Sequence, residues 1–205
     1  MFRSMWLMAT LLGTLASDVE AQYNFPPMLL QVPFLPQVPP GDWSNTKNCG
    51  QTCAVMLKGY FGYYCPSPQA ITDANKWLAN RLGNSRYYDP NGWYTNFTGP
   101  NALGKLINEY CGLRCGPASG SDVSAILNEI SRGRPVIVGV HIRNGRLATS
   151  GGISHWALAI GWNARDRRII LNDPGTSSGR QIQYPVADFE QSWGIDGRIY
   201  APVSR

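Results

Sequence analysis

The 205-residue sequence has little charge, only two histidines and no internal repeat. Charged residues make up 15% of the chain and hydrophobic residues 43%, which excludes a disordered protein and is typical of one folded domain. The absence of a repeat argues against a solenoid or a propeller. Residues 5–16 form the only long apolar run, and this run is too short to span a bilayer comfortably.

The sequence also lacks a concentrated basic patch, although its net charge is +5. The densest basic run is Arg165, Arg167 and Arg168 around Asp166, and a solvated turn explains it better than a phosphate-binding site. We therefore predict no nucleic-acid partner.

Residues 1–21 have the pattern of a secretory signal peptide. Arg3 supplies the positive start, residues 5–16 the apolar segment, and Val-Glu-Ala at 19–21 the small residues of a cleavage site. Residues 14–16 are a weaker second cleavage site, and an uncleaved anchor is the other interpretation. We expect a secreted or periplasmic protein, not inserted in a membrane after cleavage, whose mature domain spans residues 22–205.

Five cysteines follow the signal peptide, an odd number for an oxidising compartment. One nucleophilic thiol and two disulfides is the simplest arrangement. Spacing does not determine the pairing; our first choice is Cys53–Cys65 with Cys111–Cys115.

The first half of the chain predicts helices and the second half predicts strands. We expect helices at about 49–61, from Ser67 or Pro68 to 82, from Pro100 or Asn101 to about 110, and at 121–131 with Ser121 as its cap. Strands are expected at 29–35, 134–142, 156–162, 168–171, 182–184 and 198–200, and a long surface loop at 84–99. This order indicates an α+β fold, with an N-terminal helical part packed on a C-terminal antiparallel sheet.

Cys49 lies at the expected start of the first helix, with Asn48 as the candidate N-cap. The unpaired N–H groups and the positive end of the helix dipole favour a thiolate there, which is the form that attacks. Gly50 lacks a side chain and would let a substrate backbone approach. Cys49 is therefore a candidate nucleophile, although a disulfide role is the plainer alternative.

A thiol nucleophile needs a base and a group that orients the base. His141 lies within an apolar strand, where we expect a structural role. His155 opens a strand after a glycine-rich stretch, and Asp173 follows the next strand. Because the start of one strand lies beside the end of its antiparallel partner, these two side chains are expected to meet. Taken alone, Asp173 before Pro174 could simply start a turn.

Five segments together resemble the bacteriocin-processing-peptidase-like group, or double-glycine peptidase-like family, of the papain-like cysteine peptidases. They are VPFLPQ at 32–37, NCGQTC at 48–53, GRPVIV at 133–138, HWALAIG at 155–161 and LNDP at 171–174. They occur in the family's order over most of the mature chain. Gln51 stands where the family usually has proline, a replacement that we expect to matter little.

The resemblance implies that Cys49 is the nucleophile, His155 the general base and acid, and Asp173 the group that orients His155. It also implies that Gln37 stabilises the oxyanion with the Cys49 N–H, with Gln31 and Asn45 as alternatives. Candidates for substrate contact are Trp43, Gly50, Trp93, Tyr94 and Ser154. The expected partner is a peptide or protein, the expected state a monomer, and no cofactor or metal is expected.

Three alternatives stay open. Cys49, Cys53, Cys111 and Cys115 could form a metal-binding module, although structural zinc sites generally have shorter spacings. The same scaffold could serve a non-catalytic secreted binding protein. Within the enzyme class, a cell-wall amidase or a phytochelatin-synthase-like peptidyl transferase competes with a peptidase.

Overall fold

The computed structural model describes residues 23–39, 42–43, 46–87 and 97–205. The predicted signal peptide and most of the predicted loop at 84–99 lie outside these ranges. Within them, no helix combines the length and the apolarity that a bilayer crossing needs.

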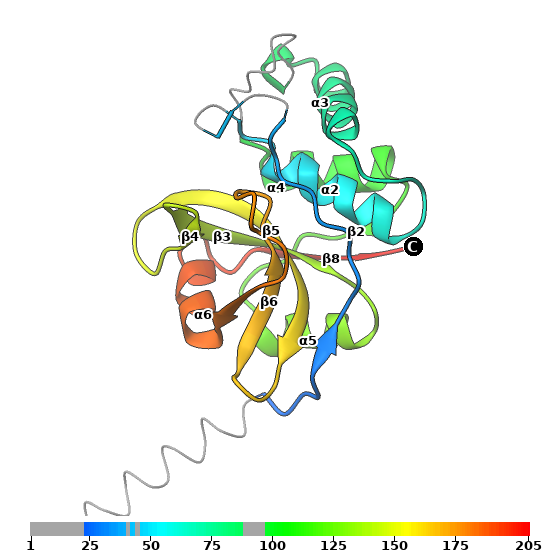
Figure 1. The fold of residues 1–205 in the computed structure, drawn as a ribbon. Coiled ribbons are helices and arrows are strands. Elements are labelled where there is room, and N and C mark those ends of the chain that lie inside the picture. Colours follow the sequence, from blue (N-terminus) through cyan, green and yellow to red (C-terminus); the bar gives the residue numbers. More distant parts are fainter. Residues whose placement is uncertain (1–22, 40–41, 44–45, 88–96) are drawn as a thin grey trace, which may run out of the picture.

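An antiparallel sheet of eight strands forms the centre of the fold (Figure 1). Its main path runs β2-β8-β3-β5-β6-β7, while β1 pairs with β5 and β4 with β3. The strands are β1 Met28–Leu29, β2 Arg114–Cys115, β3 Val136–Arg143, β4 Arg146–Leu147, β5 Ile153–Asn163, β6 Arg168–Asn172, β7 Ile182–Pro185 and β8 Tyr200–Ser204.

Helices cover both faces of this sheet (Figure 1). One face packs against α2 (Cys49–Tyr60), and α3 (Pro68–Leu82) and α4 (Pro100–Lys105) pack on α2. Helix α4 continues as a π-helix over Leu106–Tyr110. The other face packs against α5 (Val123–Ser131) and α6 (Val186–Gly194). Each face has its own apolar core because β3 and β5 are buried on both sides. A short 3₁₀ turn covers Ser85–Tyr87. The α+β prediction is confirmed.

Helix α3 shows how closely local signals set the boundaries. The Ser67 hydroxyl accepts from the Ala70 N–H, Pro68 occupies the first turn, and Gly83 ends the helix at φ 60°. Helix α2 begins at Cys49 as predicted, and the Cys49 to Leu57 stretch is buried.

Several predicted elements differ from the observed ones. The strand predicted at 29–35 is limited to β1, because the chain turns at Val32, whose N–H donates to Leu30 O, and Pro33 follows. Asp122, and not Ser121, caps α5, since the Ser121 hydroxyl bonds the Tyr200 hydroxyl. The strand predicted at 198–200 lies later, at Tyr200–Ser204. Helix α6 was not predicted. The two-residue strands β2 and β4 were not predicted either.

The predicted disulfides are absent, and all five cysteines, which the structure describes, are free. Cys53 is buried in α2, where its thiol donates to Trp156 O at 3.6 Å, whereas Cys65 is exposed beyond the end of α2. Cys111 donates to Ala54 O at 3.7 Å, and Cys115 lies on β2. The number of cysteines in the sequence does not reveal that Cys53 and Cys111 are buried in the apolar core around α2.

Candidate active site

The first turn of α2 places Cys49 at a cavity of about 800 Å³. Asn48 occupies the N-cap position, but its side chain makes no capping hydrogen bond. Asn48 is therefore the N-cap residue as predicted, but its side-chain amide is directed to other groups and not to the helix. The N–H groups of the first turn have no partners within the helix, so the Cys49 N–H can serve as a donor at the cavity.

His155 and Asp173 meet where the β5–β6 hairpin opens. The β5–β6 ladder ends at the pair Leu158 on β5 and Asn172 on β6. His155 comes before Leu158 in the chain and Asp173 directly after Asn172, so both lie beyond this end of the ladder. The distance from His155 Nε2 to Asp173 Oδ1 is 2.7 Å, and both side chains are buried. The Gly175 N–H also donates to Asp173 Oδ1, at 2.8 Å. The carboxylate is thus fixed by two donors.

His155 also interacts with Cys49. Burial by itself lowers the pKa of His155, but the charges of Asp173 and Cys49, together with hydrogen bonds to both side chains, raise that pKa to about 10. Burial raises the pKa of Asp173, but the His155 charge and the donors from His155 and Gly175 hold that pKa below its ordinary value. A buried imidazolium between a carboxylate and a thiol follows from these shifts.

The ion pair of His155 and Asp173 is expected to make stability depend on pH. A raised His pKa stabilises the fold fully below the ordinary value of about 6.5 and loses that effect as pH rises through about 10. A lowered Asp pKa stabilises it fully above about 3.9 and loses the effect as pH falls through the lowered value. Thermal unfolding should therefore show the pair's full contribution between about pH 4 and 6.5.

Asp173→Asn should flatten this pH profile, because it removes the carboxylate charge. Asp188→Asn, which changes an exposed carboxylate on α6, is the control and should leave the profile unchanged. Identical profiles for wild type and Asp173→Asn would contradict the ion pair.

The buried Cys53 and Cys111 and the half-buried Cys115 are unsuited to nucleophilic attack. Burial raises the pKa of Cys53 well above the ordinary thiol value, and the charges of Cys49 and Asp173 raise it further. Burial likewise raises the pKa of Cys111 to about 12 and that of Cys115 to about 11. Neither these three nor Cys65 lines the Cys49 cavity, among the residues that the structure describes.

Gln37 lines the same cavity as Cys49 and His155 and is nearly buried. Its N–H donates to Pro174 O at 2.9 Å, and its side-chain Nε2 donates to Thr46 O at 3.3 Å. Of the two alternatives, Gln31 is exposed and is not a lining residue, and Asn45 lies outside the described residues. Of the three candidates, Gln37 is the one that the structure places at the Cys49 cavity.

A model of the peptidase C39-like family matches residues 29–200. The chain belongs to this family of cysteine peptidases. Its mixed fold agrees with two solved structures. A C39-like peptidase from Bacillus anthracis has a TM-score of 0.62 at 18% identity, over 88% of this chain and 98% of that chain.

The second solved structure is the peptidase domain of Streptococcus ComA, a bifunctional ABC transporter involved in quorum sensing. Its TM-score is 0.53 at 16% identity, over 85% of this chain and 98% of that chain. At these identities the likeness is one of fold. No curated protein matches the chain.

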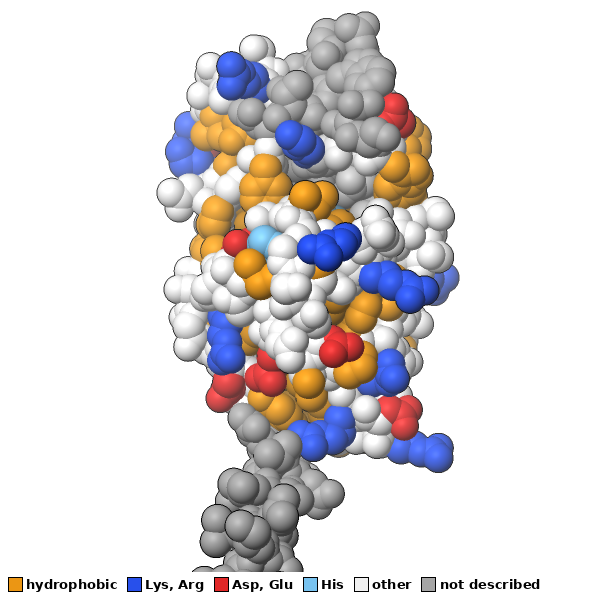
Figure 2. Space-filling model, turned by 90° about the vertical axis from the view of Figure 1, so that its left-hand side faces the viewer, with side chains coloured by type: hydrophobic (Ala, Val, Ile, Leu, Met, Phe, Trp, Pro, Cys, Tyr) orange, Lys and Arg blue, Asp and Glu red, His pale blue; other side chains and the backbone are white. Residues whose placement is uncertain are grey.

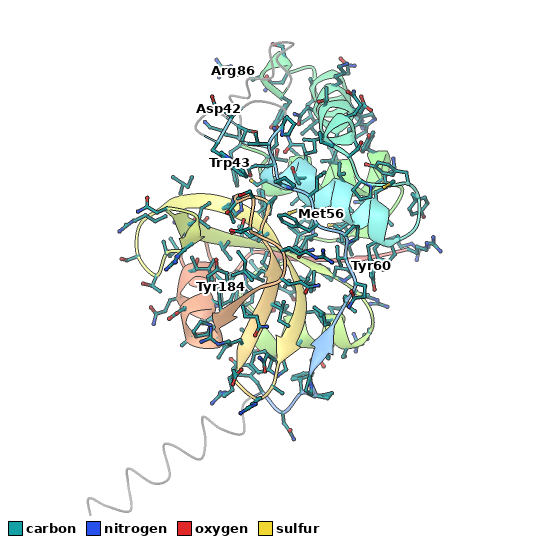
Figure 3. All side chains as sticks on the ribbon, in the orientation of Figure 1. Asp42, Trp43, Met56, Tyr60, Arg86 and Tyr184 are labelled. Atoms are coloured by element: carbon teal, nitrogen blue, oxygen red, sulfur yellow. The ribbon has the colours of Figure 1, made fainter. Side chains whose placement is uncertain are left out.

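In this C39-like peptidase, the predicted substrate contacts have different placements. Trp43 lines the cavity and is 46% exposed; in Figure 3 it lies between the helical layer and the sheet, on the side of β4. Ser154 also lines the cavity, while its hydroxyl donates to Asp196 at 2.8 Å. Trp93 and Tyr94 lie outside the described residues.

Gly50 differs from its prediction. It is buried and is not among the described residues that line the cavity. A Cβ there would come within 3.2 Å of both Thr98 and Trp156, so the glycine lets α2 pack against these residues. Gly50 therefore has a packing role that the sequence pattern did not suggest.

Phe97 and Ile153 are cavity residues that the sequence did not single out. Phe97 stacks on Trp156 with ring centroids 6.0 Å apart. Thr98 O accepts from Trp156 Nε1 at 2.6 Å, and the Thr98 hydroxyl donates to Gln51 Oε1 at 2.9 Å. Gln51, in the family's usual proline position, thus makes a contact that proline could not make.

His141 has the structural surroundings that its strand position predicted. Its Nε2 lies 2.9 Å from Asp196 Oδ2, and its backbone N–H donates to the Ser192 hydroxyl. Among the described residues, no group of three His, Cys, Asp or Glu side chains is placed to share a metal ion. Basic side chains are dispersed among acidic ones on the face shown in Figure 2.

Proposed function

We propose that this C39-like peptidase is a secreted enzyme that hydrolyses peptide bonds through Cys49, His155 and Asp173 and a thioester intermediate. The arrangement of these side chains carries the proposal, because Cys49 and His155 line one cavity and Asp173 contacts His155. The signal-peptide pattern of residues 1–21 supports export.

In the proposed mechanism, the Cys49 thiolate attacks the substrate carbonyl carbon, and the carbonyl electron pair moves to oxygen. The resulting oxyanion accepts hydrogen bonds from Gln37 Nε2 and the Cys49 N–H. His155 gives its proton to the leaving nitrogen as the C–N bond breaks, which leaves a thioester on Cys49. Water then attacks the thioester, His155 accepts the water proton, and the thiolate–imidazolium pair is restored. Asp173 orients His155 throughout.

A non-catalytic binding protein does not require a buried, charged histidine. A buried histidine without partners is most stable when neutral, yet here a carboxylate and a thiol both favour the charged form. Perturbed titratable groups that meet at a cavity are typical of active sites. This supports an enzyme over the binding-protein alternative.

Product analysis of a peptide library tests the proposal. We expect cleavage into two fragments that together gain one water, and a wild-type enzyme carrying a transient acyl group on Cys49. Products in which the acyl group has passed to a second amine or thiol would instead support a peptidyl transferase. An intact library would contradict both.

A further inference from the structure

A chain of four buried polar side chains connects α3 with the Cys49 cavity. They are Asn75 on α3, Asn48 before α2, and Thr46 and Gln37 at the cavity wall. Asn75 Nδ2 donates to Asn48 Oδ1 at 2.9 Å, and Asn48 Nδ2 donates to Thr46 Oγ1 at 2.5 Å. The chain thus begins on a helix that does not line the cavity and ends at the oxyanion donor.

The Asn48 and Thr46 side chains contact the backbone carbonyl of Gln37, and the Thr46 backbone carbonyl contacts the Gln37 side-chain amide. Asn48 Nδ2 and the Thr46 hydroxyl approach Gln37 O at 3.4 and 3.5 Å, while Gln37 Nε2 donates to Thr46 O at 3.3 Å. The Thr46 backbone carbonyl can only accept a hydrogen bond, so it faces the nitrogen of the Gln37 side-chain amide and not the oxygen. One Nε2 hydrogen is used there, and Gln37 Oε1 is buried without a hydrogen-bond partner among the described residues. In the proposed mechanism the second Nε2 hydrogen donates to the oxyanion.

This support is needed because Gln37 lies outside helices and strands. A donor that stabilises an oxyanion must be held in place before the charge develops. The residues that fix it are therefore as important to its geometry as the amide itself. Asn48 precedes Cys49, so its side chain couples the position of Gln37 to the position of the nucleophile.

Asn75 has two features that are unfavourable for stability. Asparagine is unfavourable within a helix, and Asn75 is buried with its Oδ1 lacking a hydrogen-bond partner among the described residues. An apolar residue there would remove both disadvantages, but it would leave the buried Asn48 Oδ1 without this donor. Asn75 Nδ2 also fixes the Asn48 amide so that the nitrogen faces Thr46 and Gln37.

We propose that Asn75 is a positioning residue for the oxyanion hole, acting through Asn48 and Thr46 on Gln37. The inference rests on the proposed function, because an oxyanion hole has a role only in attack on a carbonyl. Under this proposal, Asn75 affects how well the tetrahedral oxyanion is stabilised and does not affect the activation of the Cys49 thiol.

Two reactions of Cys49 separate these effects. Alkylation by iodoacetamide forms the S–C bond and expels iodide at a saturated carbon, so it needs the thiolate but creates no oxyanion. Binding of a peptide aldehyde forms an S–C bond at a carbonyl carbon and leaves the electron pair on oxygen, so it needs both. Asn75→Ala should leave the alkylation rate within about twofold and weaken aldehyde binding roughly tenfold, with kcat falling more than KM changes.

The control is Asn80→Ala, which changes an exposed asparagine on the same helix and should alter neither reaction. Asn75→Leu, of similar volume and without polar atoms, is a second variant for the case that Asn75→Ala does not fold. It should likewise keep the alkylation rate and weaken aldehyde binding. Gln37→Ala should weaken aldehyde binding at least as much, and adding Asn75→Ala to it should cause no further loss. Such non-additivity is expected only if Asn75 acts through Gln37.

Unchanged aldehyde binding in both Asn75 variants, equal losses in both reactions, or additive losses with Gln37→Ala would overturn the inference while leaving the peptidase proposal intact. A wild-type protein that neither binds aldehydes nor cleaves peptides would instead overturn the proposed function, and this inference with it.

Discussion

Replacing Cys49 with alanine is expected to lower kcat/KM for peptide cleavage by on the order of 10⁴-fold or more, the scale typical of a lost nucleophile. The reason is geometric: among the described residues, Cys49 is the one thiol that lines the cavity shared with His155 and Gln37. Steady-state cleavage of a fluorogenic peptide chosen from the library measures the effect.

Cys65→Ser is the matched control, since Cys65 is exposed and outside the cavity. It should keep wild-type activity. Full activity in Cys49→Ala would require a different nucleophile, and inactivity in both variants would point to a general effect of losing a thiol.

Gly175→Ala is expected to lower kcat roughly 10- to 100-fold through a displacement of His155. A Cβ on Gly175 would lie 2.8 Å from His155 Cε1 and 3.0 Å from both His155 Nε2 and Asp173 Oδ1. These distances are too short for carbon contacts, so the imidazole or the turn has to move. Gly175 does not have a positive φ, so backbone strain does not contribute to the expected loss.

Gly116→Ala serves as the comparison, because a Cβ there meets no atom within 4 Å and its φ is not positive either. It should retain wild-type kcat. The Gly175 variant should also fold, which thermal unfolding checks. A folded Gly175→Ala protein with wild-type kcat would contradict a catalytic role for the present position of His155.

The elements that position the proposed triad were predictable from local patterns. Helix α2 and the β5–β6 hairpin follow from hydrophobic periodicity and a polar turn, and hairpin geometry alone brings His155 to Asp173. The ends of α3 were readable from Ser67 and Gly83. Gln37 came only from the resemblance to a family, because no periodic pattern places it.

Long-range packing explains what the sequence did not reveal. The burial of Cys53 and Cys111 depends on how α2 packs against Trp156 and the π-helical turn, so the predicted disulfides were wrong. The Asn48 side chain was expected to cap α2, but a partner 27 residues later directs it elsewhere. Contacts of this kind have no local signature.

The most direct test of the thiolate–imidazolium pair is the pH dependence of iodoacetamide labelling at Cys49, in wild type and His155→Ala. In the proposed mechanism the first turn of α2 and the His155 imidazolium both stabilise the Cys49 thiolate. Wild-type Cys49 should label at pH 6 at least tenfold faster than exposed Cys65, whereas in His155→Ala it should label appreciably only near the free-thiol range of about 8.5. Equal labelling of Cys49 at pH 6 in both proteins, or an unreactive Cys49 in wild type, would contradict the account.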